Sequence, residues 1–366
     1  ASGSLLLEID RFDEDFLYQT SMPRGVGSND LGQDRGQLGS TQLTRFYRYG
    51  SKVLLVADNL EYRANEENTL EYEAVQQSFA ESVLWGFTVE AESDGTVLVD
   101  ATDFFLRDSH GLSTRLSRAK QGSYSADASR SAIFLPRTRG FPDNTEIEAV
   151  VTLTGKPNPE TRGEHILSTV VPDPTAVTVH LHHSFIRLPD DDFEPLPFDP
   201  RSGYINSPGW EGSLDFSSKI GEPMRVQFAR THRLAKKDPS AEVSEAVEPI
   251  IYYLDPGVPE PVRSALLEGA SWWNQAFEAV GYKDAFQVKL LPEGADPMDV
   301  RFNVIQWVHR STRGWSYGSS VVDPRTGEIL KGHVSLGSLR VRQDYLIAEG
   351  LLSPYSGETY SDAMLD

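Results

Sequence analysis

The stretch Phe87-Thr88-Val89-Glu90-Ala91-Glu92-Ser93-Asp94-Gly95-Thr96-Val97-Leu98-Val99 has the pattern of a β-hairpin. Two runs rich in β-branched residues, Phe87–Ala91 and Thr96–Val99, flank the turn Ser93-Asp94-Gly95. Asp-Gly between such runs is a strong hairpin signal, because both residues tolerate the positive φ of a tight turn. The first half of the chain is therefore expected to contain antiparallel strands.

Further strands surround this hairpin. Gln42–Tyr49 and Lys52–Ala57 flank a turn at Tyr49-Gly50-Ser51 and predict a second hairpin. Strand patterning also covers Ser4–Ile9, Glu146–Thr154 and Thr175–Leu188. These segments predict a β-rich N-terminal domain.

Helical spacing interrupts the strands. Within Glu67–Trp85 the apolar residues recur every three or four positions, which predicts an amphipathic helix lying on the sheet. Thr102–His110 is expected to form a second, shorter helix.

The last third of the chain has a different order of elements. Pro249–Leu254 predicts an apolar strand, and a helix is expected from about Pro259 to the C-capping Gly281. Two further strands, Phe286–Leu291 and Val300–Val308, precede a strand pair around the turn at residues 324–327. This order predicts a twisted, mostly parallel sheet with a packed helix.

The expected fold class is α+β in three parts. Residues 1–188 form the β-rich N-terminal domain with one or two helices. Residues 189–248, rich in Pro, Gly, Asp and Ser, form an extended connection. Residues 249–366 form an α/β domain.

Composition excludes several classes of function. The formal net charge of −20 disfavours nucleic acid and anionic membrane surfaces as partners. The chain has no cysteine, so any bound metal must use His, Asp or Glu. No apolar run approaches the roughly 18–20 residues that cross a bilayer, which predicts no membrane span.

The chain begins at Ala1 without a basic or apolar leader segment. We expect either that a leader has been removed or that the chain was produced without one.

Histidines and acidic residues offer two weak metal candidates. His180 and His182 lie on one face of a predicted strand and could give two imidazoles to a metal; the alternative is that they are ordinary strand residues, with His183 turned inward. The acidic run Asp190-Asp191-Asp192, with Glu194 and Asp199, could hold calcium, although a solvated acidic turn is the simpler interpretation. No histidine is followed by Glu, so a His-Glu-x-x-His helix is absent from this sequence.

Gly314-Trp315-Ser316-Tyr317-Gly318 matches Gly-x-Ser-x-Gly, the nucleophile motif of serine hydrolases. That motif needs a helix directly after the serine, whereas Ser-Ser-Val-Val-Asp follows here. A serine hydrolase using Ser316 is thus a weak hypothesis.

Several patches, in order along nearly the whole chain, resemble a large bacterial family of extracellular zinc-dependent metallopeptidases. The patches are Gly32–Gln37, Phe79–Phe87, Ser184–Pro189, Asp199–Tyr204, Pro249–Leu254, Trp273–Phe277, Gly314–Gly318 and Asp323–Leu330. Ordered patches are more specific than any single motif.

The resemblance implies a metzincin-like catalytic domain, of which residues 249–366 would be the incomplete upper half. The zinc motif, and with it every catalytic residue, would lie after Asp366. The parent protein would be a secreted or periplasmic zinc endopeptidase, while this chain would bind no zinc itself. Its partners would be a peptide or protein substrate and the missing C-terminal part of the same protein.

In such a domain an edge strand pairs with the extended substrate through backbone hydrogen bonds. By order along the chain this strand is Tyr317-Gly318-Ser319-Ser320-Val321-Val322, although an interior strand with no free edge is the alternative. A second hypothesis for the chain is a non-catalytic peptide- or glycan-binding protein derived from that family.

Overall fold

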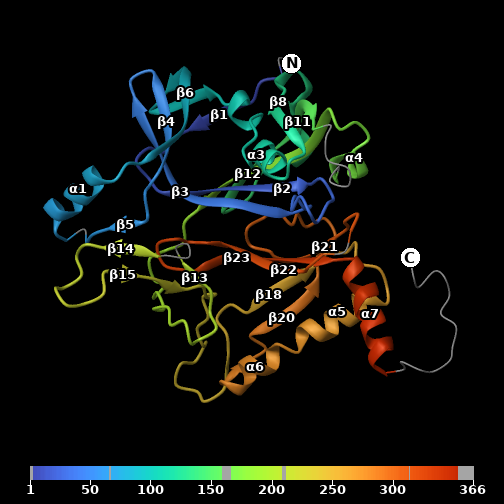
Figure 1. Cartoon of the computed structure of the whole chain (residues 1–366). Helices are drawn as coiled ribbons and strands as arrows, with labels where there is room; N and C mark the ends of the chain where they lie inside the picture. Colours follow the sequence, from blue (N-terminus) through green and yellow to red (C-terminus); the bar gives the residue numbers. More distant parts are fainter. Residues whose placement is uncertain (1–2, 66, 159–165, 208–211, 313, 353–366) are drawn as a thin grey trace.

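The computed structural model describes residues 3–65, 67–158, 166–207, 212–312 and 314–352. Its largest element is an 11-stranded antiparallel sheet that curls around its own core (Figure 1). The strand order is β1-β7-β6-β4-β3-β2-β12-β11-β10, and β8 and β9 both pair with β11. The strands are β1 (Leu6–Ile9), β2 (Phe16–Arg24), β3 (Gln37–Tyr49), β4 (Lys52–Ala57), β6 (Ser82–Ser93), β7 (Thr96–Asp100), β8 (Gly122–Ala126), β9 (Ala132–Ile133), β10 (Arg139–Gly140), β11 (Asn144–Pro157) and β12 (Ala176–Arg187).

The predicted hairpins are both present, and irregularities in the ladder explain the curl. β6 pairs with β7 around Asp94-Gly95, and β3 pairs with β4 around Gly50. The register shifts within the pairs β2–β12, β2–β3, β4–β6 and β6–β7. A bulge bends its strand and increases the local twist, so repeated bulges turn one face of the long strands inward.

Short helices close the inside of this sheet. α2 (Thr102–Phe105) places the fully buried Phe104 and Phe105 among aromatic side chains of the strands. α3 (Leu112–Arg118) and α4 (Ile166–Val170) cover a second core through Leu112, Leu116 and Leu167.

The long helix expected over Glu67–Trp85 is wrong in extent and position. α1 covers only Thr69–Ser78, and Ser82 already begins β6. Val75 is its one buried residue, and Leu70 is 80% exposed. α1 projects away from the large sheet beside β5 (Tyr62–Arg63) (Figure 1). The residues after Phe79 form a strand because Leu84 and Trp85 pack in the aromatic core.

A five-stranded sheet with the order β20-β18-β21-β23-β22 lies below the large one in Figure 1. Its strands are β18 (Ile250–Leu254), β20 (Phe286–Leu290), β21 (Asn303–Val308), β22 (Tyr317–Val322) and β23 (Ile329–Gly337). The pairs are parallel except for β22, which is antiparallel to β23. The expected single helix after Pro259 is divided into α5 (Val262–Ser271) and α6 (Asn274–Ala279).

The remaining elements are short, apart from α7 (Leu339–Leu352), which follows β23. They are β13 (Asn206–Ser207), β14 (Ser213–Asp215), β15 (Arg225–Val226), β16 (Phe228–Ala229), β17 (Ser244–Glu245) and β19 (Tyr282–Lys283). None of the helices in the described residues has both the length and the apolar character needed to cross a bilayer.

The expected fold class is therefore wrong. The chain is β-rich, with 40% strand and 18% helix, and a large curled antiparallel sheet dominates it. A metzincin-like parallel sheet with helices does not describe it. The prediction failed because it assigned the fold class largely from the last third of the sequence. The long antiparallel strands of the first half make up the larger sheet.

The two sheets pack against each other through an apolar contact. Leu17, Leu43 and Ile186 of the large sheet form one buried cluster with Val300 and with Val321 of β22. The sheet face that carries Val321 is thus covered by the large sheet.

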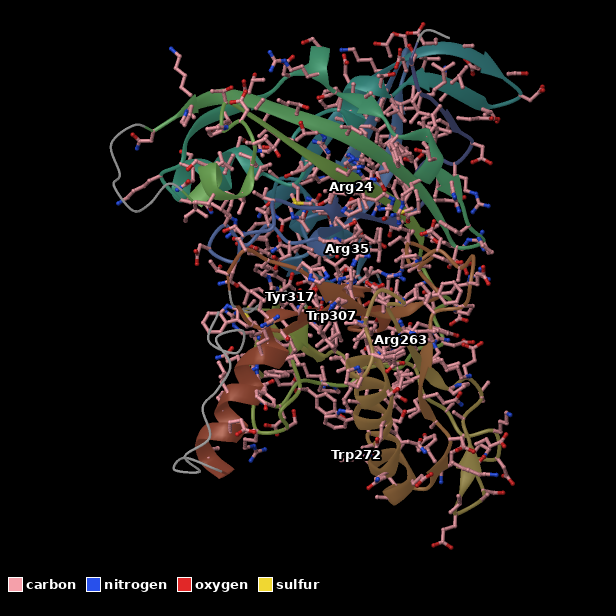
Figure 2. All side chains as sticks on the ribbon, turned by 90° about the vertical axis from the view of Figure 1, so that its right-hand side faces the viewer. Arg24, Arg35, Arg263, Trp272, Trp307 and Tyr317 are labelled. Carbon is pink, nitrogen blue, oxygen red and sulfur yellow. The ribbon has the colours of Figure 1, made fainter. Side chains whose placement is uncertain are left out.

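The loop between β2 and β3 locks the two sheets together. The carboxylate of Asp34 accepts hydrogen bonds from Arg310 Nε at 2.8 Å and Nη2 at 2.9 Å, and both side chains are buried. Tyr317 Oη also donates to Asp34 at 3.3 Å. Arg35 pairs with Asp255 at 2.8 Å and donates to the Trp307 carbonyl. Figure 2 labels Arg35, Trp307 and Tyr317 in the region where the two sheets meet. The N-terminal part of the chain therefore holds the first residue of β22.

Candidate functional site

β22 ends the five-stranded sheet, so one of its sides has no strand partner among the described residues. Its register with β23 runs from Tyr317 opposite Ser335 to Val322 opposite Ile329. Gly318 and Ser319 are exposed. An exposed edge carries backbone N–H and C=O groups that can pair with another extended chain.

A cleft of about 780 Å³ lies beside this edge, and we call it the edge-strand cleft. Ser319, Ser320 and Val322 form one wall, and β3 contributes to the other. Its remaining lining residues are Gly39, Thr41, Gln42, Leu43, Ala57, Asp58, Asn59, Leu60, Glu61, Tyr62, Ala80, Ser82, Ser207, Gly212, Leu214, Arg225, Arg230 and Pro324. The cleft is large enough for several residues of an extended peptide.

The β3 wall has an unpaired stretch as well. β3 pairs with β2 up to Thr44 and with β4 only from Thr44 onward. Among the described residues, Gly39, Thr41 and Gln42 thus belong to a part of β3 that has a strand partner on one side only. β22 and β3 therefore each border the cleft with a stretch that has no second strand partner among the described residues.

The charged side chains of the cleft differ in their pairing. Asp58 accepts a hydrogen bond from Arg45, which also pairs with Asp15. Glu61 is exposed to solvent. Arg230 is half-buried, and its Nε donates to the Asn206 carbonyl at 2.8 Å. The sequence offered no signal for Arg230, because it lies far from β22 along the chain in a segment without a motif.

A second cavity, the inter-sheet pocket of about 350 Å³, lies between the two sheets. Glu146 is buried there and accepts hydrogen bonds from Ser184 Oγ at 2.7 Å and from Asn144 Nδ2, and its Oε2 lies 3.0 Å from His182 Nδ1. Lys331, from β23, donates to the carbonyls of Pro297 and Asp299. The polar groups of this pocket mainly join its own walls to each other, so we regard it as a structural contact.

Burial shifts the ionisation of these groups. Desolvation raises the pKa of Glu146 to about 8 and lowers the pKa of Lys331 to about 8. It also lowers the pKa of His182 and of His333 to about 3 each. Both imidazoles are therefore neutral at pH 7, and neither Nε2 atom has a hydrogen-bond partner among the described residues.

The buried histidines predict that the protein loses stability in acid. The unfolded state binds protons at these imidazoles below pH 6.5, whereas the folded state does not until about pH 3, so the free energy of unfolding should fall between these values. Each pKa unit corresponds to about 1.4 kcal/mol. Glu146 acts in the opposite direction, because burial favours its protonated form in the folded state. It contributes one proton and the two histidines contribute two, so the net effect is a loss of stability. Urea denaturation at pH 7 and pH 4.5 measures the difference.

The variant His333→Gln tests whether the buried imidazole of His333 contributes to this loss of stability in acid. It should lose less stability than the wild type over the same pH interval, because one proton fewer binds to its unfolded state. A pH profile parallel to that of the wild type would contradict the role of His333, whatever the cost of the substitution at pH 7.

The two histidines proposed for a metal are each engaged by a different carboxylate. His180 Nδ1 lies 2.6 Å from Glu148 Oε1, whereas His182 Nδ1 faces Glu146. In the described part of the chain no three or more His, Asp or Glu side chains come together in a way that could hold a metal ion. The described residues therefore do not fit zinc.

The acidic run proposed for calcium is engaged by arginines. Asp190 pairs with Arg233 at 2.6 Å, and Asp199 pairs with Arg201 at 2.6 Å. Asp191 lies 4.0 Å from Arg325. These carboxylates point to separate partners.

Ser316 does not have the setting of a hydrolase nucleophile. It directly precedes a strand, β22, and its Oγ accepts a hydrogen bond from the backbone N–H of Gly337 at 3.2 Å. A nucleophile elbow instead leads into a helix. The geometry gives the serine hydrolase hypothesis no support.

Comparison with known proteins places the chain in a family. The model described as "Domain of unknown function (DUF5117)" matches residues 36–237, which is more than half of the chain. No curated protein and no solved structure matches the sequence. The matched residues include β3 and Arg230 of the edge-strand cleft, whereas β22 lies after them. The chain belongs to the DUF5117 family.

Proposed function

We propose that this chain is the peptide-aligning portion of a secreted zinc-dependent metalloendopeptidase, and that an extended peptide binds along the outer edge of β22. The observation that carries the proposal is the position of β22, which is the last strand of its sheet and lines a cleft of about 780 Å³. Addition of a peptide strand to such an edge obtains affinity from backbone hydrogen bonds and specificity from alternate side chains.

The lining of the cleft supports a peptide in particular. Ser319 and Ser320 are small, so an approaching backbone meets little steric hindrance. The clamp formed by Asp34, Arg310 and Tyr317 holds the first residue of β22, which reduces the entropy lost when a peptide is ordered on it.

The zinc ion, when bound in the parent protein, would supply a water activated for attack on the peptide bond. Because the described residues do not fit zinc, its ligands would come from other residues of the parent protein. This chain would contribute only the alignment of the substrate.

Proline substitutions in β22 test peptide binding. Consecutive residues of an antiparallel strand direct their N–H and C=O groups to opposite sides, so of Ser319 and Ser320 one faces β23 and the other faces outward. We expect one of Ser319→Pro and Ser320→Pro to keep the wild-type melting temperature but bind an amidated, fluorescein-labelled Ser/Thr/Val octapeptide about five- to tenfold more weakly, for the loss of roughly one hydrogen bond. The other should melt at a lower temperature, because it loses a ladder bond. Fluorescence anisotropy measures the affinity.

Wild-type binding by both proline variants would contradict binding at this edge. The catalytic half of the proposal is tested on a polypeptide that contains this chain and any segment that follows it in the gene. Casein hydrolysis that 1,10-phenanthroline abolishes is expected. Peptide binding without chelator-sensitive hydrolysis would instead favour a non-catalytic binding protein.

A further inference from the structure

Arg230 stands out among the charged groups of the edge-strand cleft. Several other arginines around it have a carboxylate partner: Arg45 pairs with Asp58, Arg233 with Glu328 and Arg325 with Asp323. Among the described residues Arg230 has no such partner, and its one side-chain hydrogen bond is the Nε contact with the Asn206 carbonyl. Its two Nη groups are thus available to a ligand.

The backbone holds Arg230 at one end of β22. The N–H of Arg230 donates to the Ile205 carbonyl, and the next residue, Thr231, exchanges hydrogen bonds with Gly327 and Ile329 at the turn between β22 and β23. Arg230 and Val322 both line the cleft. The guanidinium therefore lies at the Val322 end of β22.

The surroundings of Arg230 favour an anion. It is half-buried, and burial lowers its pKa without an offsetting contribution from a described carboxylate. A guanidinium that has lost part of its water and has no counter-ion gains much from a carboxylate, which it can bind through two parallel hydrogen bonds. Of the acidic residues in the cleft, Asp58 is paired with Arg45, and Glu61 is exposed and screened by solvent.

We propose that Arg230 determines the specificity of the cleft, and that the bound peptide carries a carboxylate at the Val322 end of β22. This inference rests on the proposed binding of peptide to β22 and names its substrate class. The carboxylate is either an Asp or Glu side chain or the C-terminal carboxylate of the peptide. Arg225 also lines the cleft, but it belongs to the short sheet of β14 and β15.

A set of labelled octapeptides tests the proposal and separates the two sources. The parent is the amidated Ser/Thr/Val octapeptide. One series carries a single Glu at each position in turn, a matched series carries Gln, and one further peptide has a free C-terminal carboxylate. We expect the Glu peptide, at one end of the scan only, or the free-acid peptide, to bind wild-type protein about tenfold more tightly than its neutral match.

Variants of the chain provide the controls. Arg230→Gln should bind the acidic peptide and its neutral match with equal affinity. Arg230→Lys should recover only part of the preference, because an ammonium lacks the planar fork of donors. Arg225→Gln removes the same charge from the same cleft and should leave most of the preference in place. Melting temperatures confirm that each variant is folded.

The outcomes distinguish the two proposals. Equal affinities of wild-type protein for Glu and Gln peptides at every position and for the free acid overturn the role of Arg230 but leave peptide binding to β22 in place. A preference lost equally in Arg225→Gln and Arg230→Gln also overturns it, in favour of a general field of positive charge. If wild-type protein binds none of the peptides, both proposals fail.

Discussion

Replacement of Asp34 by alanine is expected to lower the free energy of unfolding by about 3–5 kcal/mol, the cost of leaving one member of a buried ion pair without its partner. The side chains of Asp34 and Arg310 are only 5% and 3% exposed, and two hydrogen bonds join them. Without the carboxylate the guanidinium stays between the sheets with no charged partner among the described residues, although its bond to the Trp315 carbonyl remains. Urea denaturation measures the loss.

A double-mutant cycle separates the ion pair from packing. Arg310→Met alone should also be costly, whereas Asp34→Ala with Arg310→Met should cost clearly less than the sum of the single changes, because no unpaired charge remains. Additive effects would contradict the assignment of the clamp. Arg35→Gln is the matched control, because its side chain is 49% exposed and its pairing with Asp255 should contribute less than about 1 kcal/mol.

Replacement of Phe104 by alanine should be comparably destabilising, by about 3–5 kcal/mol. Phe104 is fully buried, and its ring lies within 6 Å of Tyr18, Trp85, Phe87, Phe105 and His183. The rings come from three strands and one short helix, so they cannot all close on the cavity that alanine leaves. Differential scanning calorimetry measures the change in melting temperature and enthalpy.

Phe216→Ala is the matched control. Phe216 is 36% exposed and contacts Phe79 at 5.7 Å between ring centroids. Its loss should cost much less than that of Phe104, since little apolar surface is buried there. A similar cost for both variants would show that the aromatic cluster around Phe104 is not the centre of the core.

Local features of the fold could be predicted from the sequence. The Asp94-Gly95 and Gly50 turns set the β6–β7 and β3–β4 hairpins, because few residues accept the positive φ that both glycines adopt, +84° and +60°. The order of strands and helices in residues 250–337 followed in the same way from apolar runs and turn residues. Such signals act between neighbours in the chain.

Helical periodicity misled where tertiary packing prevailed. The apolar spacing through Phe79 and Val83 predicted one continuous helix, but Leu84 and Trp85 are drawn into the aromatic core as part of β6. A short apolar run can satisfy either period, and only the partner surface decides between them.

The candidate site likewise combines a feature that the sequence predicted with features that depend on the tertiary structure. β22 was expected from its β-branched residues, but its place at the end of the sheet depends on which strand β23 joins on its other side. Arg230 joins the site because its neighbour Thr231 pairs with residues 327–329 at the turn after β22, far along the chain. No pattern within either segment contains this information.

By itself, the sequence determined the turns, most strand segments and the absence of cysteine chemistry, since these depend on local backbone preference and composition. Only the tertiary structure decided the curl of the large sheet, the Asp34–Arg310 clamp and the cleft with the Arg230 guanidinium. The physical reason is that these features arise from contacts between residues distant in sequence, whose geometry is set by packing the whole chain.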